Sequence, residues 1–170
     1  MTRLAAKTDA NQAEIVAVRL LALDASTTAC GWCLMEDGEW QESGVWKPPP
    51  KLPWWQRVQC YEASLGAWIW RLDIDTVVYE LATGNKGNMH TNRLLGAVEY
   101  VTRRACLINP TLVTVTASQV IASGCHKHAL YVASAIAGRE VTGGDEADAI
   151  GVALAGWRKI QHAALKRLEE

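Results

Sequence analysis

A nearly uninterrupted apolar segment, residues 15–23, constrains the fold of this chain more than any other feature. It reads Ile-Val-Ala-Val-Arg-Leu-Leu-Ala-Leu and leads directly into Asp24. A short apolar run without polar alternation is typical of a central strand that is buried on both faces. Sheets that contain such strands are covered by helices on both sides, so we expect an α/β fold.

The patterns that follow predict three antiparallel strands and then an alternation of helices and strands. The hairpin signal is the Asp37-Gly38 pair between the short runs 31–35 and 39–46. The prolines between 48 and 53 cannot continue a sheet, because proline donates no backbone hydrogen bond. The remaining elements are predicted as helices at 54–72, 90–106, 117–122, 127–138 and from Asp145 to the C-terminus, with strands at 76–80 and 111–116. The predicted order is therefore βββαβαβααα.

Length and charge favour one compact domain. The chain has 170 residues, of which 49% are hydrophobic, enough for one full core. We expect residues 1–15 to form a loose leader and residues 16–170 a single domain. The formal net charge of −1 argues against a purely electrostatic coat for nucleic acid, but it leaves room for local basic patches.

The sequence shows no sign of export or membrane insertion. No stretch reaches the roughly 18 consecutive apolar residues of a membrane span, and the first twenty residues lack the order of a signal peptide. We therefore expect a cytoplasmic protein. Its five cysteines stand mostly in apolar segments, where we expect reduced core thiols. Cys30-Gly-Trp-Cys33 imitates a redox or zinc motif, but it enters a strand and has no second pair.

Four carboxylates mark a candidate site. Asp24 and Glu80 each end a predicted strand, where side chains leave the core but keep a rigid support. Asp145 and Asp148 are three residues apart at a helix start, so they share one face near the positive end of the helix dipole. Converging acids resist ionisation unless a cation lies among them.

Hard oxygen ligands suit Mg²⁺ or Mn²⁺, and two such ions about 4 Å apart can drive phosphodiester hydrolysis without a protein nucleophile. The competing interpretation is a structural one, because a single acid at a strand end or in a first helical turn is usually a solvated cap. Four acids found by separate cues favour the shared site.

Three segments together resemble RuvC-type Holliday junction resolvases. They are residues 21–32 (Leu-Ala-Leu-Asp-Ala-Ser-Thr-Thr-Ala-Cys-Gly-Trp), 77–80 (Val-Val-Tyr-Glu) and 145–154 (Asp-Glu-Ala-Asp-Ala-Ile-Gly-Val-Ala-Leu). The resemblance covers roughly residues 18–160, and its most specific part is the last segment, which follows a glycine pair. It implies an RNase H-like fold with a mixed five-stranded sheet, a homodimer, and Mg²⁺-dependent paired nicking of four-way DNA junctions.

Residue by residue, the resemblance makes Asp24, Glu80, Asp145 and Asp148 the catalytic metal ligands for two ions. Lys127 looks like the basic residue that the family places at a helix start near the scissile phosphate. For contacts to the DNA backbone we expect Lys86, Arg93 and Lys127, with Arg103, Arg104 and Arg139 on the same face.

The sequence also departs from the family pattern. Asp24 is followed by Ala25-Ser26, where cellular members commonly have Pro-Gly, so a phage or organellar branch is expected; for a phage protein the location is the host cytoplasm. Thr83 stands where cellular resolvases carry an aromatic that wedges into the junction. Junction opening must then use another group, with Met89, His90 and the 84–88 loop as candidates.

Two histidines and two tryptophans have more than one interpretation. His126 and His128 are two residues apart and would point in different directions on a helix, so a shared metal ion is geometrically awkward, but either one can orient water or phosphate near the site. Trp54 and Trp55 are expected to be exposed and to stack on bases or line a subunit interface.

The function also has competing interpretations. Asp24-Ala-Ser-Thr-Thr28 is similar to the first phosphate loop of sugar kinases and actin-like ATPases, but those proteins are much longer. A noncatalytic junction-binding protein would keep shape recognition without cleavage. A flap or branched-DNA nuclease of the same fold would keep the chemistry and differ in its substrate.

Overall fold

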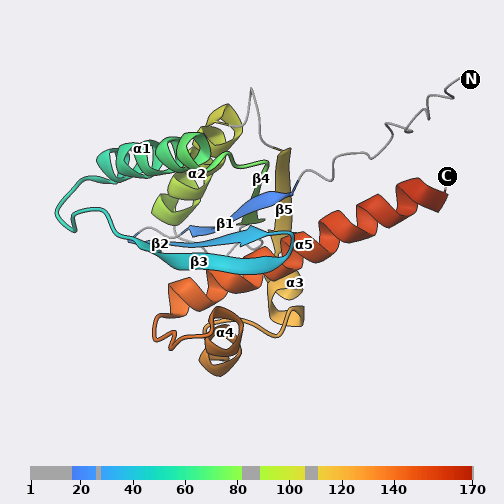
Figure 1. Cartoon of the computed structure of the whole chain (residues 1–170). Coiled ribbons are helices and arrows are strands. Elements are labelled where there is room, and N and C mark those ends of the chain that lie inside the picture. The colour runs from blue at the N-terminus through green and yellow to red at the C-terminus, as the bar shows by residue number, and fades with distance from the viewer. Residues whose placement is uncertain (1–16, 26–27, 82–88, 106–110, 170) are drawn as a thin grey trace, which may run out of the picture.

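The computed structural model describes residues 17–25, 28–81, 89–105 and 111–169; within it, the side chains of 89–95 and of Val98 are not described (Figure 1). The expected leader, 1–15, lies outside this range. The elements follow the predicted order and are β1 (Arg19–Ala25), β2 (Cys30–Glu36), β3 (Glu39–Trp46), α1 (Trp54–Leu72), β4 (Thr76–Leu81), α2 (Met89–Ala105), β5 (Thr111–Thr116), α3 (Ala117–Ala122), α4 (Leu130–Ala137) and α5 (Gly144–Glu169).

The five strands form one mixed sheet in the order β3-β2-β1-β4-β5, so the apolar strand β1 is central, as predicted. β2 pairs with β1 and β3 in antiparallel fashion, whereas β4 is parallel to both β1 and β5. In the turn between β2 and β3, Asp37 and Gly38 have φ of 52° and 86°. Positive φ at both central residues is what a tight hairpin turn requires, and it explains the Asp-Gly pair.

Helices cover both faces of the sheet. α1 and α2 lie on one face, and α5 lies on the other with α3 and α4 beside it (Figure 1). Successive residues of β1 serve opposite faces: Leu20 and Ala22 pack toward α5, whereas Leu21 and Leu23 pack toward α1 and α2. This alternation explains why the strand is apolar at every position.

α5 lies close against the sheet because glycines face it. A Cβ on Gly31 of β2 would lie 1.9 Å from the backbone oxygen of Asp145, and one on Gly156 of α5 would lie 2.6 Å from Val78. Neither position tolerates a larger residue without a shift of the helix or the strand. The two glycines therefore set how closely α5 approaches β2 and β4.

Two predicted boundaries are wrong. β1 begins at Arg19 and not near Ile15, because the N–H of Val18 donates to Asp37 Oδ1 at 2.9 Å and leaves the strand ladder. α4 begins at Leu130 and not at 127, because the preceding residues form a tight turn in which the N–H of Ala129 donates to His126 O at 2.7 Å. Among the described residues, no helix is long and apolar enough to cross a membrane.

Candidate active site

Asp24 and Glu80 lie side by side on the α5 face of the sheet. Asp24 is an even number of residues from Leu20 and Ala22 in β1, so it lies on the same face of the sheet as they do. In β4, Glu80 likewise lies on the face of Val78, which also packs toward α5. The parallel register pairs Leu23 with Tyr79. One residue further along both strands, Asp24 comes level with Glu80.

The first turn of α5 brings Asp145 and Asp148 to the same place. Asp24 pairs with Gly31 across β1 and β2, and Gly31 lies directly against the backbone oxygen of Asp145. Both helix aspartates are half-buried, whereas Ala147 and Ala149 between and beside them are buried against the sheet. Residues from three separate parts of the chain therefore meet where the start of α5 crosses the ends of β1 and β4.

The four carboxylates share one electrostatic environment. The pKa of Asp24 is raised from 3.8 to about 7, first by burial and then by the negative charges of Asp148, Glu80 and Asp145, in that order. The pKa of Glu80 is also raised, first by burial and then by Asp148. Lys127 opposes the shift at both acids. The cluster thus has excess negative charge that one lysine offsets in part.

The donor chemistry of this cluster fits a hard divalent cation, which prefers carboxylate oxygens and would relieve their repulsion. Within the described part of the chain, no three His, Cys, Asp or Glu side chains converge closely enough to form a metal-ligand group. The acids are near enough to shift one another's pKa, and cation binding would require their oxygens to move closer together.

Lys127 lies at the site but not at a helix start, which corrects the sequence expectation. It lies three residues before α4, in the loop that follows α3. Its backbone N–H donates to Asp148 Oδ1 at 2.6 Å, and this bond attaches the loop to α5. The side chain of Lys127 is exposed. A pocket of about 270 Å³ adjoins it, lined by Glu80, Ala117, Val120, Ile121, His126, Lys127, His128 and Asp148.

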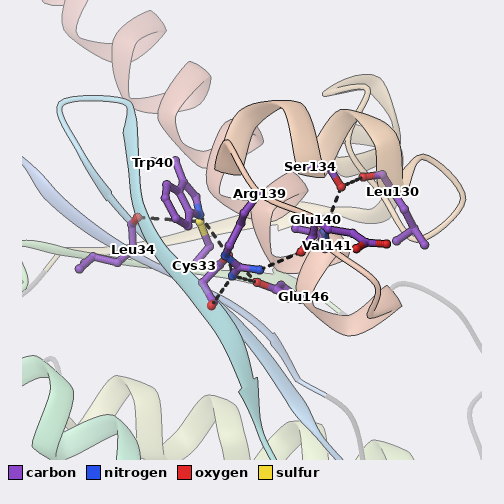
Figure 2. A network of polar contacts seen from close by, with 10 residues as sticks. Cys33, Leu34, Trp40, Leu130, Ser134, Arg139, Glu140, Val141 and Glu146 are labelled. Atoms are coloured by element: carbon purple, nitrogen blue, oxygen red, sulfur yellow. Dashed lines mark hydrogen bonds and ion pairs between the residues drawn. The ribbon is translucent and has the colours of Figure 1, made fainter.

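A buried acid that sequence reasoning missed fixes the start of α5. Glu146 is 9% exposed; its Oε1 accepts a hydrogen bond from Ser43 Oγ at 2.7 Å and forms an ion pair with Arg139. Figure 2 shows Arg139 between Trp40 and Glu146, and its guanidinium carbon lies 5.7 Å from the centroid of the Trp40 ring. One residue turns a helix by about 100°, so Glu146 points inward where Asp145 does not. This rotation between neighbouring helix positions is the sequence signal that could have identified Glu146 as buried.

The expected basic face does not form as predicted. Arg139 binds Glu146 and Ser43 and is a structural residue. Arg103 and Arg104 lie at the end of α2, on the opposite face of the sheet, where they pair with Glu99 and Glu62. Lys86, Thr83 and the 84–88 loop lie outside the described residues, as do the side chains of Arg93, Met89 and His90.

The structure tests the predictions made for the cysteines and for the exposure of two tryptophans. Cys30 and Cys33 are buried in separate cores on opposite faces of β2, so they cannot pair with each other; with Cys60 and Cys125 they are free thiols, as expected. Trp54 and Trp55 are 46% and 48% exposed, in line with the expectation, although Trp70 is more exposed at 90%.

Comparison with known proteins shows the fold. No family model matches the sequence, and no curated protein is significantly similar to it. Among solved structures, RuvC from Thermus thermophilus in complex with a Holliday junction substrate matches with a TM-score of 0.70 and 16% identity over 85% of this chain and 96% of that chain.

Another Thermus thermophilus RuvC structure matches with a TM-score of 0.64 and 18% identity, over 85% of this chain and 97% of that one. The yeast mitochondrial Holliday junction resolvase Ydc2 matches with a TM-score of 0.58 and 12% identity, over 89% of this chain and 84% of that one. The resemblance found in the sequence is therefore confirmed for the fold, which is the RNase H-like fold of RuvC.

Proposed function

From this shared fold and the acids it carries, we propose that the chain is a metal-dependent endodeoxyribonuclease that resolves four-way DNA junctions by paired symmetric nicks. The observation that carries the proposal is the environment of Asp24, whose pKa is raised to about 7 by burial and by Asp148, Glu80 and Asp145. A stable fold does not need mutually repelling acids, whereas a cation site does.

In this proposal Asp24, Glu80, Asp145 and Asp148 hold two Mg²⁺ ions, with Mn²⁺ as a substitute. When bound, the ions activate a water and stabilise the leaving oxygen of the phosphodiester. The protein supplies the positions: two adjacent parallel strands fix Asp24 and Glu80, and the first turn of α5 fixes the helix aspartates. Glu146 and Arg139 pair with each other, and both bond to Ser43 of β3, which holds that turn against the strand.

Lys127 attracts and orients the scissile strand. Its exposed ammonium lies on the rim of a strongly acidic site, where the phosphate must approach against negative charge. The backbone bond from Lys127 to Asp148 keeps this cation near the acids.

Symmetric cutting of a four-way junction requires two active sites, so we propose a homodimer in which each protomer nicks one strand. Residues 16–170 form the nuclease domain in each protomer. We propose that the protein acts in the cytoplasm of its cell or, for a phage protein, of the host.

The decisive experiment compares substrates and variants. The purified protein is incubated with Mg²⁺ and a four-way junction, a linear duplex or a flap DNA, alongside Asp145→Asn and, as a matched control, Glu39→Gln, an exposed acid of β3. We expect paired nicks in the junction from the wild type and from the control, and loss of cleavage of at least roughly a thousandfold in Asp145→Asn.

The same experiment separates the competing functions. Cleavage of flaps and junctions alike would replace the resolvase with a general branched-DNA nuclease of the same fold. Junction binding without cutting, at any divalent ion tested, would favour a noncatalytic architectural protein.

The DNA contacts have their own test. If Lys86 and Arg93 contact phosphate, replacing both with glutamine weakens junction binding and lowers the salt slope of log K by about two. An unchanged slope would remove both residues from the interface. Lys127→Gln is expected to lower the slope by about one.

A further inference from the structure

The first turn of α5 is attached to the sheet face at several of its residues. The backbone oxygen of Asp145 lies against Gly31, and the backbone oxygen of Ala147 accepts a hydrogen bond from Cys125 Sγ at 3.4 Å. A thiol is a weak donor, so these two contacts set mainly how closely the helix approaches the sheet. Glu146, which lies between these two helix residues, adds an ion pair and a short hydrogen bond.

Four side chains form a polar network around Glu146 (Figure 2). Glu146 Oε1 accepts hydrogen bonds from Ser43 Oγ at 2.7 Å and from Arg139 Nη2. The same Arg139 nitrogen donates to the backbone oxygen of Ser43 at 3.0 Å, and Trp40 Nε1 donates to Ser43 Oγ at 3.0 Å. Arg139 directly follows Gly138, whose φ of 62° ends α4. The network therefore joins β3, the connection from α4 to α5, and the first turn of α5.

Stability alone does not account for this network. The side chain of Glu146 is 12% exposed and that of Arg139 is 43% exposed, so the acid loses most of its hydration. Replacing a buried ion pair with apolar groups of similar volume is often neutral or stabilising, because desolvation offsets the attraction between the charges. A fully paired network does favour a single geometry, because moving one member breaks several hydrogen bonds at once.

The geometry that this network sets is the rotation of α5 about its own axis. Successive helix residues point about 100° apart, so Asp145 and Asp148 lie on the side away from Glu146 and about 60° from each other. Both aspartates lie close enough to Asp24 for their charges to act on it. Because Asp24 and Glu80 are fixed by the sheet, any rotation of the helix start would move the two aspartates relative to them.

We propose that Glu146, held by Ser43 and Arg139, is a positioning residue that sets where Asp145 and Asp148 present their carboxylates to the divalent cation. This inference rests on the proposed function and deepens it, because it assigns a role to an acid that is not itself a metal ligand. Glu146 points toward β3, away from the two aspartates, so it acts on the ion through the rotation of the helix.

The first test measures Mn²⁺ binding by the full chain without DNA, from the electron paramagnetic resonance signal of the free ion. We expect Glu146→Leu to weaken Mn²⁺ binding at least about tenfold. Glu146→Gln keeps an oxygen that accepts from both Ser43 and Arg139, so it should bind Mn²⁺ nearly as well as the wild type. The matched control is Tyr61→Phe, which removes a buried 3.0 Å hydrogen bond to Thr102 on the other face of the sheet and should leave Mn²⁺ binding unchanged.

The second test measures junction nicking at a temperature where every variant is folded. We expect Glu146→Leu to lower kcat about ten- to a hundredfold with KM unchanged, because misplaced metal ligands slow the chemistry and not DNA binding. Glu146→Gln should keep most of kcat. The double variant Arg139→Met with Glu146→Leu replaces the whole pair with apolar groups, so it should melt at or above the wild-type temperature and still nick slowly. This variant keeps the test valid if Glu146→Leu alone folds poorly.

Three outcomes would overturn the inference and leave the nuclease in place. The pair is only structural if the double variant binds Mn²⁺ and nicks like the wild type. The charge of Glu146 matters, and not its position, if Glu146→Gln loses as much as Glu146→Leu. Lower stability is the cause if Tyr61→Phe weakens Mn²⁺ binding equally.

The Mn²⁺ titrations also separate this inference from the proposed function. If the wild type binds Mn²⁺ but nicks no junction, the proposed function fails, and the titrations still decide the role of Glu146. If the wild type binds no Mn²⁺, there is no cation for the aspartates to hold and both proposals fail.

Discussion

The two faces of the sheet are built in opposite ways. On the α1 and α2 face, large rings fill the core: Trp32 lies 4.2 Å from Trp68 and 6.1 Å from Trp46 between ring centroids, and Trp46 contacts Tyr61 at 6.2 Å. On the α5 face the buried core is made mainly of aliphatic residues and alanines, and the backbone of α5 lies directly against Gly31 of β2.

The difference separates stability from chemistry. The aromatic face buries large apolar area and contains none of the four candidate acids. The α5 face contains all four, together with the buried Glu146, so bringing these charges together has an electrostatic cost. We infer that the aromatic face compensates for that cost. Four predictions test this division.

The largest effect is expected at the aromatic face. Trp32→Ala should lower the free energy of unfolding by about 3–5 kcal/mol, because it leaves a cavity among Trp46, Trp68 and α1. Urea denaturation measures this change. Trp70→Ala, at a residue that is 90% exposed, is the control and should change stability by no more than about 0.5 kcal/mol. Equal losses in both variants would mean that the cluster does not carry the stability.

The second largest effect is expected from the electrostatic cost of the acids on the α5 face. Asp24 has a folded pKa of about 7 against an ordinary value of 3.8, so the folded protein keeps a proton that the unfolded chain releases. Its contribution to stability is full below about pH 4 and is lost as the pH rises through about 7, on the order of 4 kcal/mol in total.

Asp24→Asn keeps a neutral group at this position, so the variant should not lose stability as the pH rises. Without divalent ions, the variant should match the wild type near about pH 4 and exceed its stability by a few kcal/mol at about pH 8. Chemical denaturation across this pH range is the measurement. Parallel pH profiles for the two proteins would show that Asp24 ionises normally.

A smaller effect is expected from the spacing of α5. Gly31→Ala puts a Cβ 1.9 Å from the backbone oxygen of Asp145, so the start of α5 must move. We expect a loss of about 1–3 kcal/mol, together with a loss of nicking that exceeds what the lower stability explains, because Asp145 moves with the helix. Stability and cleavage are measured at a temperature where the variant is fully folded. Full activity in a destabilised variant would contradict the role of this spacing.

The smallest effect has the opposite sign. Gly66 lies in α1, and apart from its chain neighbours and the nearby backbone of its own helix, no atom lies within 4 Å of the place where its Cβ would be. Gly66→Ala should therefore stabilise the protein by up to about 1 kcal/mol, the difference in helix propensity, and leave nicking unchanged. Thermal denaturation checks it, and a destabilised Gly66→Ala would show that this side of α1 is covered in solution.

The sequence by itself determined the order of the elements and the identity of the acids. The uninterrupted apolar run of β1, the Asp37-Gly38 turn and the helical spacing in α1 and α5 are local signals, and local sterics and hydrophobic periodicity suffice to interpret them. Asp24, Glu80, Asp145 and Asp148 could be named because each stands at the end or start of such an element.

Tertiary structure alone decided what those residues face. Asp24 and Glu80 share the α5 face because of the alternation of side chains along each strand and the register between the strands. Glu146 binds Arg139 and Ser43 because the rotation of α5 turns it toward β3. The backbone bond from Lys127 to Asp148 attaches its turn to α5. These are contacts between segments distant in the sequence. Their strength depends on distance and burial, which residue order does not contain, so the raised pKa of Asp24 and the pocket beside it became visible only in the folded chain.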